Sequence, residues 1–205
     1  MPERTGSRPL RDGLGFFGRF LKNPTSVGAV LPSSRNLSRL LVGSLDEVQP
    51  GELVVEYGPG TGPMTEVVHE RLPAGAKYLG IELEPSFYER LVSRFPTRDF
   101  HLGSAADIES ILNERGLPRP VRILSGLPFA SLPLPVQDQI VKGLVWAMQD
   151  SNCDFRTFQY VHAYRMRAAK HFRAQMSERF ANFQRLGPSM RNVPPAYVLR
   201  YYGVN

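Results

Sequence analysis

The chain has 205 residues, a formal net charge of +6 and 42% hydrophobic residues, which suits one α/β domain with an appended segment and argues against general disorder. A single cysteine, Cys153, excludes an internal disulfide and a multi-cysteine zinc site. No run of about 18 apolar residues predicts a transmembrane helix, and no basic-apolar-small signal opens the sequence, so we expect a cytoplasmic enzyme.

The charge is distributed unevenly along the chain. Residues 1–40 carry a net charge of +5, residues 41–155 a net charge of −7 and residues 156–205 a net charge of +8. Only four of the 25 basic residues are lysines, and arginine in such excess favours phosphate partners. Nucleic acid and an anionic membrane surface both fit this pattern, and a cation-rich surface without a partner is the alternative.

The first helix is expected at residues 10–22, after a loose tail at residues 1–9. Its apolar side chains fall on one broad arc at helical spacing: Leu10, Leu14, Phe16, Phe17, Phe20 and Leu21. Arg8, Arg11, Arg19 and Lys22 lie on the opposite side. This pattern predicts that residues 8–22 dock on an anionic membrane. The alternative is that the apolar face packs on the rest of the protein.

A second helix is expected at residues 33–45, and strands then alternate with helices. The expected strands are 53–56, 78–81, 100–102, 121–124 and 157–163, and the expected helices between them are 63–71, 85–94, 108–115 and 135–148. Two more β-like runs lie at residues 180–185 and 196–202. This alternation predicts a doubly wound, Rossmann-like α/β fold with a mainly parallel seven-stranded sheet and helices on both faces.

A glycine-rich loop follows the first strand of the alternating region, in the segment Glu56-Tyr57-Gly58-Pro59-Gly60-Thr61-Gly62. Glycines at alternate positions allow a sharp turn and a close approach to a ligand, next to the free N–H groups of a helix start. The spacing is G-x-G-x-G rather than G-x-G-x-x-G, which disfavours a nicotinamide dehydrogenase. The alternative is an ordinary turn between a strand and a helix.

Three further segments follow the next strands. Glu82 ends the second strand, 20 residues after Gly62, where a doubly wound fold places the carboxylate for ribose hydroxyls; Glu84 is the alternative and is expected to face solvent. The small residues of 103–107 leave room for a planar base, and residues 125–129 follow the fourth strand. All four segments lie at carboxyl ends of strands, where open α/β sheets bind ligands.

At these segments, residues 50–165 resemble the class I S-adenosylmethionine-dependent methyltransferases. Residues 21–34, Ser125-Gly126-Leu127-Pro128-Phe129 and residues 192–196 look more narrowly like the bacterial phospholipid N-methyltransferases, which methylate phosphatidylethanolamine stepwise to phosphatidylcholine. That family is similar to the rRNA adenine dimethyltransferases, whose fourth motif is Asn-Leu-Pro-Tyr. Here Ser125 and Gly126 lead into Leu-Pro-Phe, which weakens the case for an adenine pocket for RNA.

The resemblance implies a set of site residues and no metal. The S-adenosyl-L-methionine site would comprise Ser33, Ser34, Glu56, Gly58, Gly60, Gly62, Glu82, Ser104 and Ala105. The methyl-transfer chamber would comprise Ser125, Gly126, Leu127, Pro128 and Phe129, with Phe129 against the acceptor amine. The alternatives are a helix N-cap for Ser33 and Ser34 and a core position for Phe129.

The function implied is N-methylation of phosphatidylethanolamine and its mono- and dimethyl derivatives at the inner face of the membrane. Residues 1–45 would dock on the membrane and cover the cofactor, residues 46–205 would form the methyltransferase domain, and no nucleic acid partner is expected. An RNA adenine N-methyltransferase or RNA-binding protein on the same fold is the alternative. The general base is left open among His101, His162 and His171. The candidates for the lipid phosphate are Arg165, Arg167, Lys170, Arg173, Arg191 and Arg200, and those for the headgroup site are Tyr164, Tyr197, Tyr201 and Tyr202.

Overall fold

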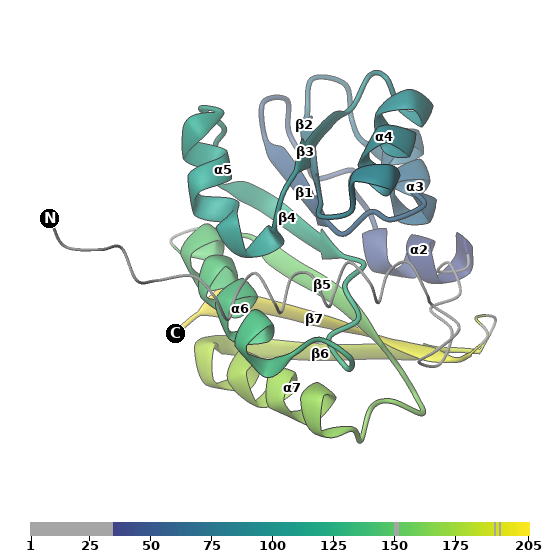
Figure 1. Ribbon diagram of the computed structural model, residues 1–205, viewed down its shortest axis with the longest axis vertical. Helices are drawn as coiled ribbons and strands as arrows, with labels where there is room; N and C mark the ends of the chain where they lie inside the picture. Colours follow the sequence, from purple (N-terminus) through teal and green to yellow (C-terminus); the bar gives the residue numbers. More distant parts are fainter. Residues whose placement is uncertain (1–34, 150–151, 191, 193) are drawn as a thin grey trace, which may run out of the picture.

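The computed structural model describes residues 35–149, 152–190, 192 and 194–205, which form a seven-stranded sheet covered by helices on both faces (Figure 1). The strands are β1 (Leu53–Tyr57), β2 (Lys77–Glu82), β3 (Asp99–Leu102), β4 (Pro120–Ser125), β5 (Asp154–Tyr160), β6 (Phe180–Ser189) and β7 (Ala196–Val204). The expected doubly wound α/β fold with seven strands is confirmed.

The strand order is β3-β2-β1-β4-β5-β7-β6. Strands β1 to β5 are parallel, whereas β7 runs antiparallel to both β5 and β6. The chain moves outward from β1 to β3 and then starts again with β4 on the other side of β1. The junction of β1 and β4 is therefore the switch point, where folds of this kind form their ligand crevice.

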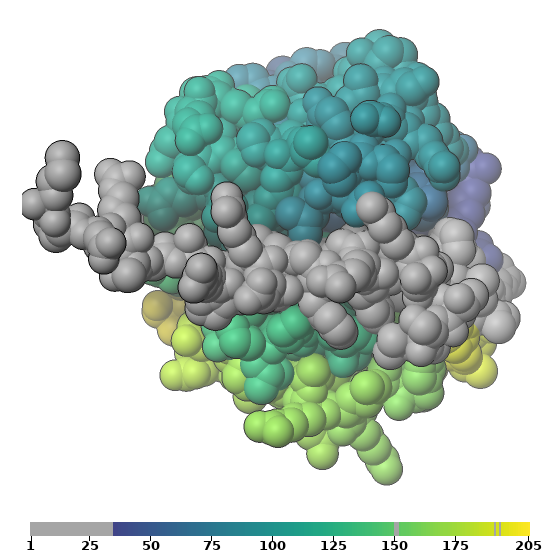
Figure 2. Space-filling view, in the orientation of Figure 1, coloured from purple at the N-terminus to yellow at the C-terminus, as the bar shows by residue number. Residues whose placement is uncertain are grey.

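Each face of the sheet has its own apolar core. Helices α2 (Arg35–Val42), α3 (Pro63–Arg71) and α4 (Pro85–Arg94) cover one face. Helices α5 (Ile108–Glu114), α6 (Leu134–Met148) and α7 (Arg167–Arg179) cover the other, with the short helix η2 (Ala105–Asp107) leading into α5. On the face shown in Figure 2, the earlier part of the described chain forms the upper, teal region of the surface and the later part forms the lower, green to yellow region.

The structure differs from the sequence-based expectation at three places in the C-terminal half. The fifth strand is Asp154–Tyr160 rather than 157–163, because Asp154 and Arg156 are buried as an ion pair inside the sheet. Helix α7 was not expected at all, and the two final strands extend to Ser189 and Val204. In the N-terminal half, helix α2 ends at Val42 rather than at residue 45.

The predicted helix at residues 8–22, together with Ser33 and Ser34, lies outside the described residues. Among the helices that the structure does describe, none is long and apolar enough to cross a membrane.

Candidate active site

The loops after β1 and β4 interlock at the switch point. Gly58 has a positive φ of 62°, and a Cβ there would lie 2.6 Å from the side chain of Leu127. A Cβ on Gly126 would lie 2.6 Å from the carbonyl oxygen of Gly58, and the Gly126 N–H donates to the Tyr57 carbonyl at 2.8 Å. Glycine is required at both positions because the two loops approach at backbone distance.

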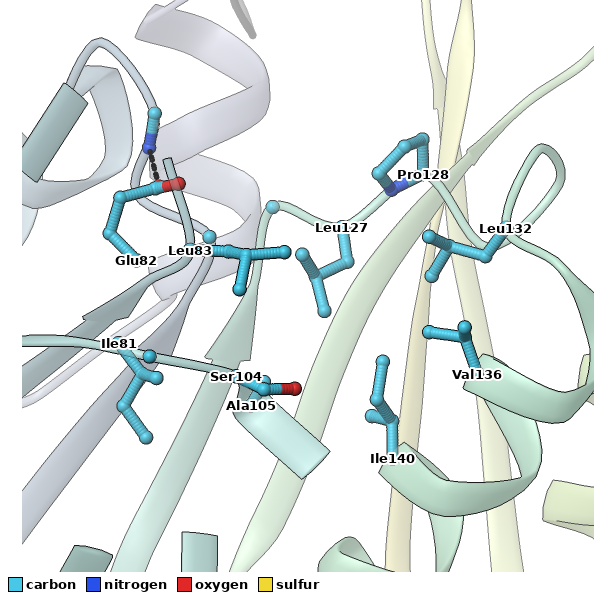
Figure 3. A pocket seen from close by; sticks show the side chains of 14 residues that line it. Ile81, Glu82, Leu83, Ser104, Ala105, Leu127, Pro128, Leu132, Val136 and Ile140 are labelled. Carbon is cyan, nitrogen blue, oxygen red and sulfur yellow. Dashed lines mark hydrogen bonds between the residues drawn. The ribbon is translucent and has the colours of Figure 1, made fainter. Parts of the chain in front are cut away.

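The Glu82 carboxylate is fixed at the end of β2 by two backbone donors. The Gly60 N–H donates to Oε2 at 2.9 Å (Figure 3), and the Glu84 N–H donates to Oε1 at 2.9 Å. Burial raises the pKa of Glu82 from its ordinary value, and these hydrogen bonds oppose the increase. Glu82 is thereby held in one orientation at the edge of a cavity.

Residues at the carboxyl ends of β1, β2, β3 and β4 line this one cavity. Its lining consists of Gly58, Gly60, Ile81, Glu82, Leu83, Gly103, Ser104, Ala105, Gly126, Leu127, Pro128, Leu132, Val136 and Ile140. Five residues predicted for the cofactor and three predicted for the methyl-transfer chamber are thus brought together. A Cβ on Gly60, which has a φ of +59°, would meet no atom within 4 Å, so its backbone borders open space.

Sequence reasoning missed the contribution of α6 to this cavity. Val136 and Ile140 on the helix, and Leu132 just before it, supply the apolar wall opposite Glu82 and Leu83 (Figure 3). Their spacing is that of a helix face buried in a core, so the sequence carries no signal that they border a ligand.

Glu56, predicted for the cofactor, lies behind the cavity lining. Its Oε2 accepts hydrogen bonds from Tyr78 at 2.6 Å and Thr65 at 2.9 Å. Among the described residues its Oε1 has no hydrogen-bond partner, and burial raises the pKa of this carboxyl to about 7. An unpaired buried oxygen is costly and is characteristic of functional sites.

Two other predicted residues have local structural contacts and are absent from the lining. Gly62 is the N-cap of α3, where a Cβ would lie 2.9 Å from the Phe95 ring. Ser125 accepts a hydrogen bond from the Leu127 N–H at 3.2 Å, which shapes the loop after β4. Glu84, expected to face solvent, is only 5% exposed, although the first residues of α4, which it precedes as N-cap, are exposed.

A second cavity, of about 190 Å³, lies beyond Pro128, the residue that lines both cavities. Its lining consists of Pro128, Phe129, Ala130, Ser131, Phe158, Gln159, Tyr160, His162, Ala163 and Met166. Phe129 is fully buried and stacks on Phe172 with 3.9 Å between ring centroids, so its ring packs in the core behind the cavity wall, as in the alternative interpretation of the sequence.

Gln137, another residue that sequence reasoning missed, supports that wall. Its amide donates to the carbonyls of Phe129 at 2.7 Å and Leu132 at 3.0 Å. A glutamine on a helix gives no sequence signal of this role, because its partners lie in the preceding loop.

The three candidate bases occupy different places. The His162 ring stacks on Tyr160 with 5.6 Å between centroids and lines the second cavity. His171 pairs with Asp138 at 2.8 Å, which joins α7 to α6. His101 lies on β3, where desolvation lowers its pKa. Of the three, only His162 lines either cavity.

Comparison with known proteins provides relatives of two kinds, although no family model matches the chain. An ornithine lipid N-methyltransferase from Singulisphaera acidiphila is 33% identical over 136 residues, which cover 65% of this chain and 70% of the relative. A ribosomal RNA small subunit methyltransferase A from Cupriavidus taiwanensis is 36% identical over 83 residues, which cover 40% of this chain. The chain spans only 28% of the length of that second relative.

The chain belongs to the class I S-adenosylmethionine-dependent methyltransferases. Solved structures share the fold of this methyltransferase. TrmN from Thermus thermophilus has a TM-score of 0.63 at 12% identity, covering 91% of this chain and 53% of TrmN. The O-methyltransferase TomG from Streptomyces achromogenes, in complex with SAM, has a TM-score of 0.59 at 14% identity, covering 94% of this chain and 90% of TomG.

The cofactor of the methyltransferase is S-adenosyl-L-methionine, and the residues present fit it. Gly60 leaves space for close approach, Glu82 presents a fixed carboxylate for hydroxyl donors, and Ser104 and Ala105 are small enough for a planar base. The unpaired Oε1 of Glu56 behind the glycine loop provides an acceptor for a cationic group. When bound, the cofactor supplies a methyl group on a sulfonium, which is a good leaving group.

Proposed function

We propose that this methyltransferase transfers methyl groups to the primary amine of a membrane lipid, phosphatidylethanolamine, and to its mono- and dimethyl derivatives. The observation that carries the proposal is the second cavity, an aromatic and apolar chamber that meets the cofactor cavity at Pro128. An acceptor amine bound in this chamber would lie across the loop after β4 from the cofactor cavity.

The lining of the chamber suits an amine that changes charge during the reaction. Phe158 and Tyr160 provide apolar surface, which disfavours an ammonium and so lowers its pKa. A free ethanolamine ammonium resembles lysine, with a pKa of roughly 10, and must lose a proton before it can attack the methyl group. Aromatic faces also tolerate the cationic product, with about 0.5–2 kcal/mol of cation–π attraction.

His162 is the residue that we propose as the proton acceptor. Among the described residues that line the chamber, it carries the one imidazole. Its stacking on Tyr160 orients the ring. Gln137 fixes the loop after β4 through two of its carbonyls, which would keep the chamber wall in place for a bound amine.

The comparisons support a lipid acceptor more than a nucleic acid. The lipid-modifying relative is matched over 70% of its length, and the rRNA-modifying relative over 28%. The loop after β4 reads Ser125-Gly126-Leu127-Pro128-Phe129 here, which departs from the motif of the rRNA enzymes. The name of the lipid relative makes ornithine lipid the second candidate acceptor, since it also presents a primary amine on a membrane lipid.

A thin-layer assay with labelled S-adenosyl-L-methionine tests the proposal. Separate vesicles containing phosphatidylethanolamine or ornithine lipid, and a naked rRNA fragment, serve as acceptors for the full chain. We expect label in phosphatidylethanolamine and its methylated products. Label only in ornithine lipid would support a lipid acceptor but replace phosphatidylethanolamine with ornithine lipid as the substrate. Label only in RNA would overturn the proposal.

A further inference from the structure

Two arginines and two tyrosines from four separate elements form a cluster on the α7 side of the sheet, which we name the Arg–Tyr cluster. The Arg173 guanidinium of α7 lies 3.7 Å from the ring centroid of Tyr164, in the loop after β5. The Arg185 guanidinium of β6 lies 5.5 Å from the same centroid and 4.8 Å from that of Tyr197 on β7. The tyrosine rings contact each other at 5.2 Å.

The two cations of the Arg–Tyr cluster are not neutralised by the protein. Neither Arg173 nor Arg185 forms an ion pair with a carboxylate in the part of the chain that the structure describes. Residues 156–205 contain nine basic side chains and one acidic one, Glu178, which pairs with Arg179. Like charges held against one ring repel each other, so an anion placed between them would be stabilised.

The Arg–Tyr cluster is connected to the proposed acceptor chamber by one hydrogen bond. Arg173 Nη1 donates to Gln159 Oε1 at 2.6 Å, and Gln159, which is 2% exposed, lines the second cavity. The buried amide therefore fixes the Arg173 guanidinium beside the chamber wall. The Arg185 guanidinium has no hydrogen-bond partner among the described residues and keeps its donors for a ligand.

We propose that the Arg–Tyr cluster is a binding subsite for the anionic group of the lipid headgroup, with Arg173 and Arg185 as its two donors. This inference rests on the proposed function, because it assumes that the amine of the same headgroup occupies the adjacent chamber. The guanidinium fork binds planar or tetrahedral oxyanions through paired hydrogen bonds, and the tyrosine rings hold the two forks in place.

The subsite explains how one enzyme recognises a lipid amine among other cellular amines. In phosphatidylethanolamine a short ethylene linker joins the amine to a phosphodiester, and in ornithine lipid a short alkyl chain joins the amine to a carboxylate. Both headgroups present an anion close to the amine. A simple amine such as ethanolamine fills the chamber and leaves the Arg–Tyr cluster unpaired.

Soluble headgroup compounds allow binding at the subsite to be tested separately from binding to a membrane. The acceptors are glycerophosphoethanolamine, Nα-acetylornithine and ethanolamine, each methylated by the full chain with S-adenosyl-L-methionine. For Arg185→Gln we expect KM for the anion-bearing acceptor to rise roughly 10- to 100-fold, as for loss of a hydrogen bond between charged groups, while kcat is nearly unchanged. KM for ethanolamine should stay constant, and Arg185→Lys should restore part of the affinity.

Arg90→Gln is the matched control, because Arg90 is an exposed arginine of α4 on the opposite face of the sheet. Arg173→Gln tests the second donor, and its unfolding midpoint shows whether loss of the Gln159 contact affects the fold. An equal rise in KM for ethanolamine, or no change in KM for either anionic acceptor while lipid is still methylated, would overturn the subsite alone. Selective loss of affinity for an rRNA fragment would also overturn it. Absence of methylation of every lipid and headgroup amine would overturn the proposed function itself.

Discussion

The Glu82 carboxylate is the residue on which cofactor affinity should depend most. Both of its oxygens accept backbone N–H groups, and it borders the cofactor cavity. Glu82→Ala should weaken S-adenosyl-L-methionine binding by roughly 1.5–3 kcal/mol, the range for a hydrogen bond to a charged group. Isothermal titration calorimetry measures this loss, and turnover at saturating cofactor should change less.

Glu84→Ala is the matched variant for Glu82, because Glu84 is the neighbouring carboxylate and lies outside the cavity lining. Cofactor binding that survives Glu82→Ala and is lost in a folded Glu84→Ala protein would assign the cofactor contact to Glu84 instead.

Glu56 links stability to pH. The pKa of its carboxyl is about 7 in the folded protein and about 4.5 in an unfolded chain, so the folded state binds more protons between these values. The free energy of unfolding should therefore fall as the pH rises from about 4.5 to about 7, by up to roughly 3 kcal/mol. Glu56→Gln should remove this decline. Urea unfolding at pH 5 and pH 8 measures both slopes, and an equal decline in the variant would assign it to other groups.

His162 should govern the rate of the chemical step. A positioned base contributes typically 10²- to 10⁴-fold, so His162→Gln should lower kcat by roughly 100-fold while cofactor binding is retained. His171→Gln is the control, since His171 pairs with Asp138 away from both cavities. A kcat that is unchanged in His162→Gln would show that the proton leaves by another route.

At the scale of elements, one buried carboxylate joins α2 to the sheet. Asp154 of β5 pairs with Arg122 at 2.5 Å, Arg156 at 2.9 Å and Arg200 at 2.6 Å. Arg122 and Arg156 also donate to carbonyls at the C-terminal end of α2, including that of Val42. The helix end and the carboxylate together compensate three cations at a position where solvent is largely excluded.

Asp154→Asn should therefore destabilise the protein by about 3 kcal/mol or more, because it leaves three arginines around a neutral group. Asp99→Asn, at an exposed position on β3, is the control and should stay within about 0.5 kcal/mol of the wild type. Urea denaturation measures both. A similarly small change in Asp154→Asn would mean that the α2 carbonyls alone hold the arginines.

The same ion cluster explains why the fifth strand was misplaced from sequence. Asp154 and Arg156 are polar residues in a strand that is buried along its whole length, and the pattern alone places them before the strand. The sequence pattern did not predict helix α7 for a related reason. Only Ala169, Phe172 and Met176 are buried in it, and most of its other residues are polar or charged. Its place is set by packing on β6 and α6, which no local pattern reports.

The two cavities differ in how far they could be predicted. Gly58, Gly60 and Glu82 are local signals at strand ends, and their cavity could be predicted because parallel strands end at one edge of the sheet. The second cavity joins the loop after β4 to β5 and the loop that follows β5, and the Arg–Tyr cluster joins that later loop to α7, β6 and β7. Assembly of the Arg–Tyr cluster depends on the antiparallel pairing of β7 with both β5 and β6, which the sequence did not indicate.

At the scale of the whole molecule, the part of the chain that supplies the cofactor cavity and the part that supplies most of the proposed headgroup site carry opposite net charges. Residues 41–155, which supply the cofactor cavity, carry a net charge of −7, and residues 156–205, which supply most of the proposed headgroup site, carry +8. A cationic cofactor suits the acidic half. The proposed membrane substrate would place the basic half at an anionic bilayer, and we therefore expect the molecule to approach it with the second cavity facing it.

The rim of the second cavity, which we define as Val161, Arg165 and Met166, has side chains that suit an approach to a bilayer. Met166, which lines the cavity, is 47% exposed, and Val161 in the same loop is 40% exposed. The basic side chain of Arg165 lies between them in sequence and is exposed. Apolar residues beside cations are typical of surfaces that enter the interfacial region of a bilayer.

Val161→Asp with Met166→Asp should weaken binding to anionic vesicles roughly tenfold or more, since two apolar side chains can no longer be buried in lipid. Cofactor affinity should be retained, because neither residue lines the cofactor cavity. Vesicle flotation measures the loss, and Phe17→Glu with Phe20→Glu in the same assay tests the helix predicted at residues 10–22.

The matched control for the rim is Val92→Asp with Leu102→Asp, which changes two residues that are 42% and 45% exposed elsewhere on the surface. Both double variants add the same negative charge, so general repulsion from the anionic lipid affects them alike. Only insertion of the rim itself predicts that the first pair loses vesicle binding and the second retains most of it. Equal flotation of the two variants would leave the basic half attracted to the bilayer by charge alone, with the second cavity free to face any direction.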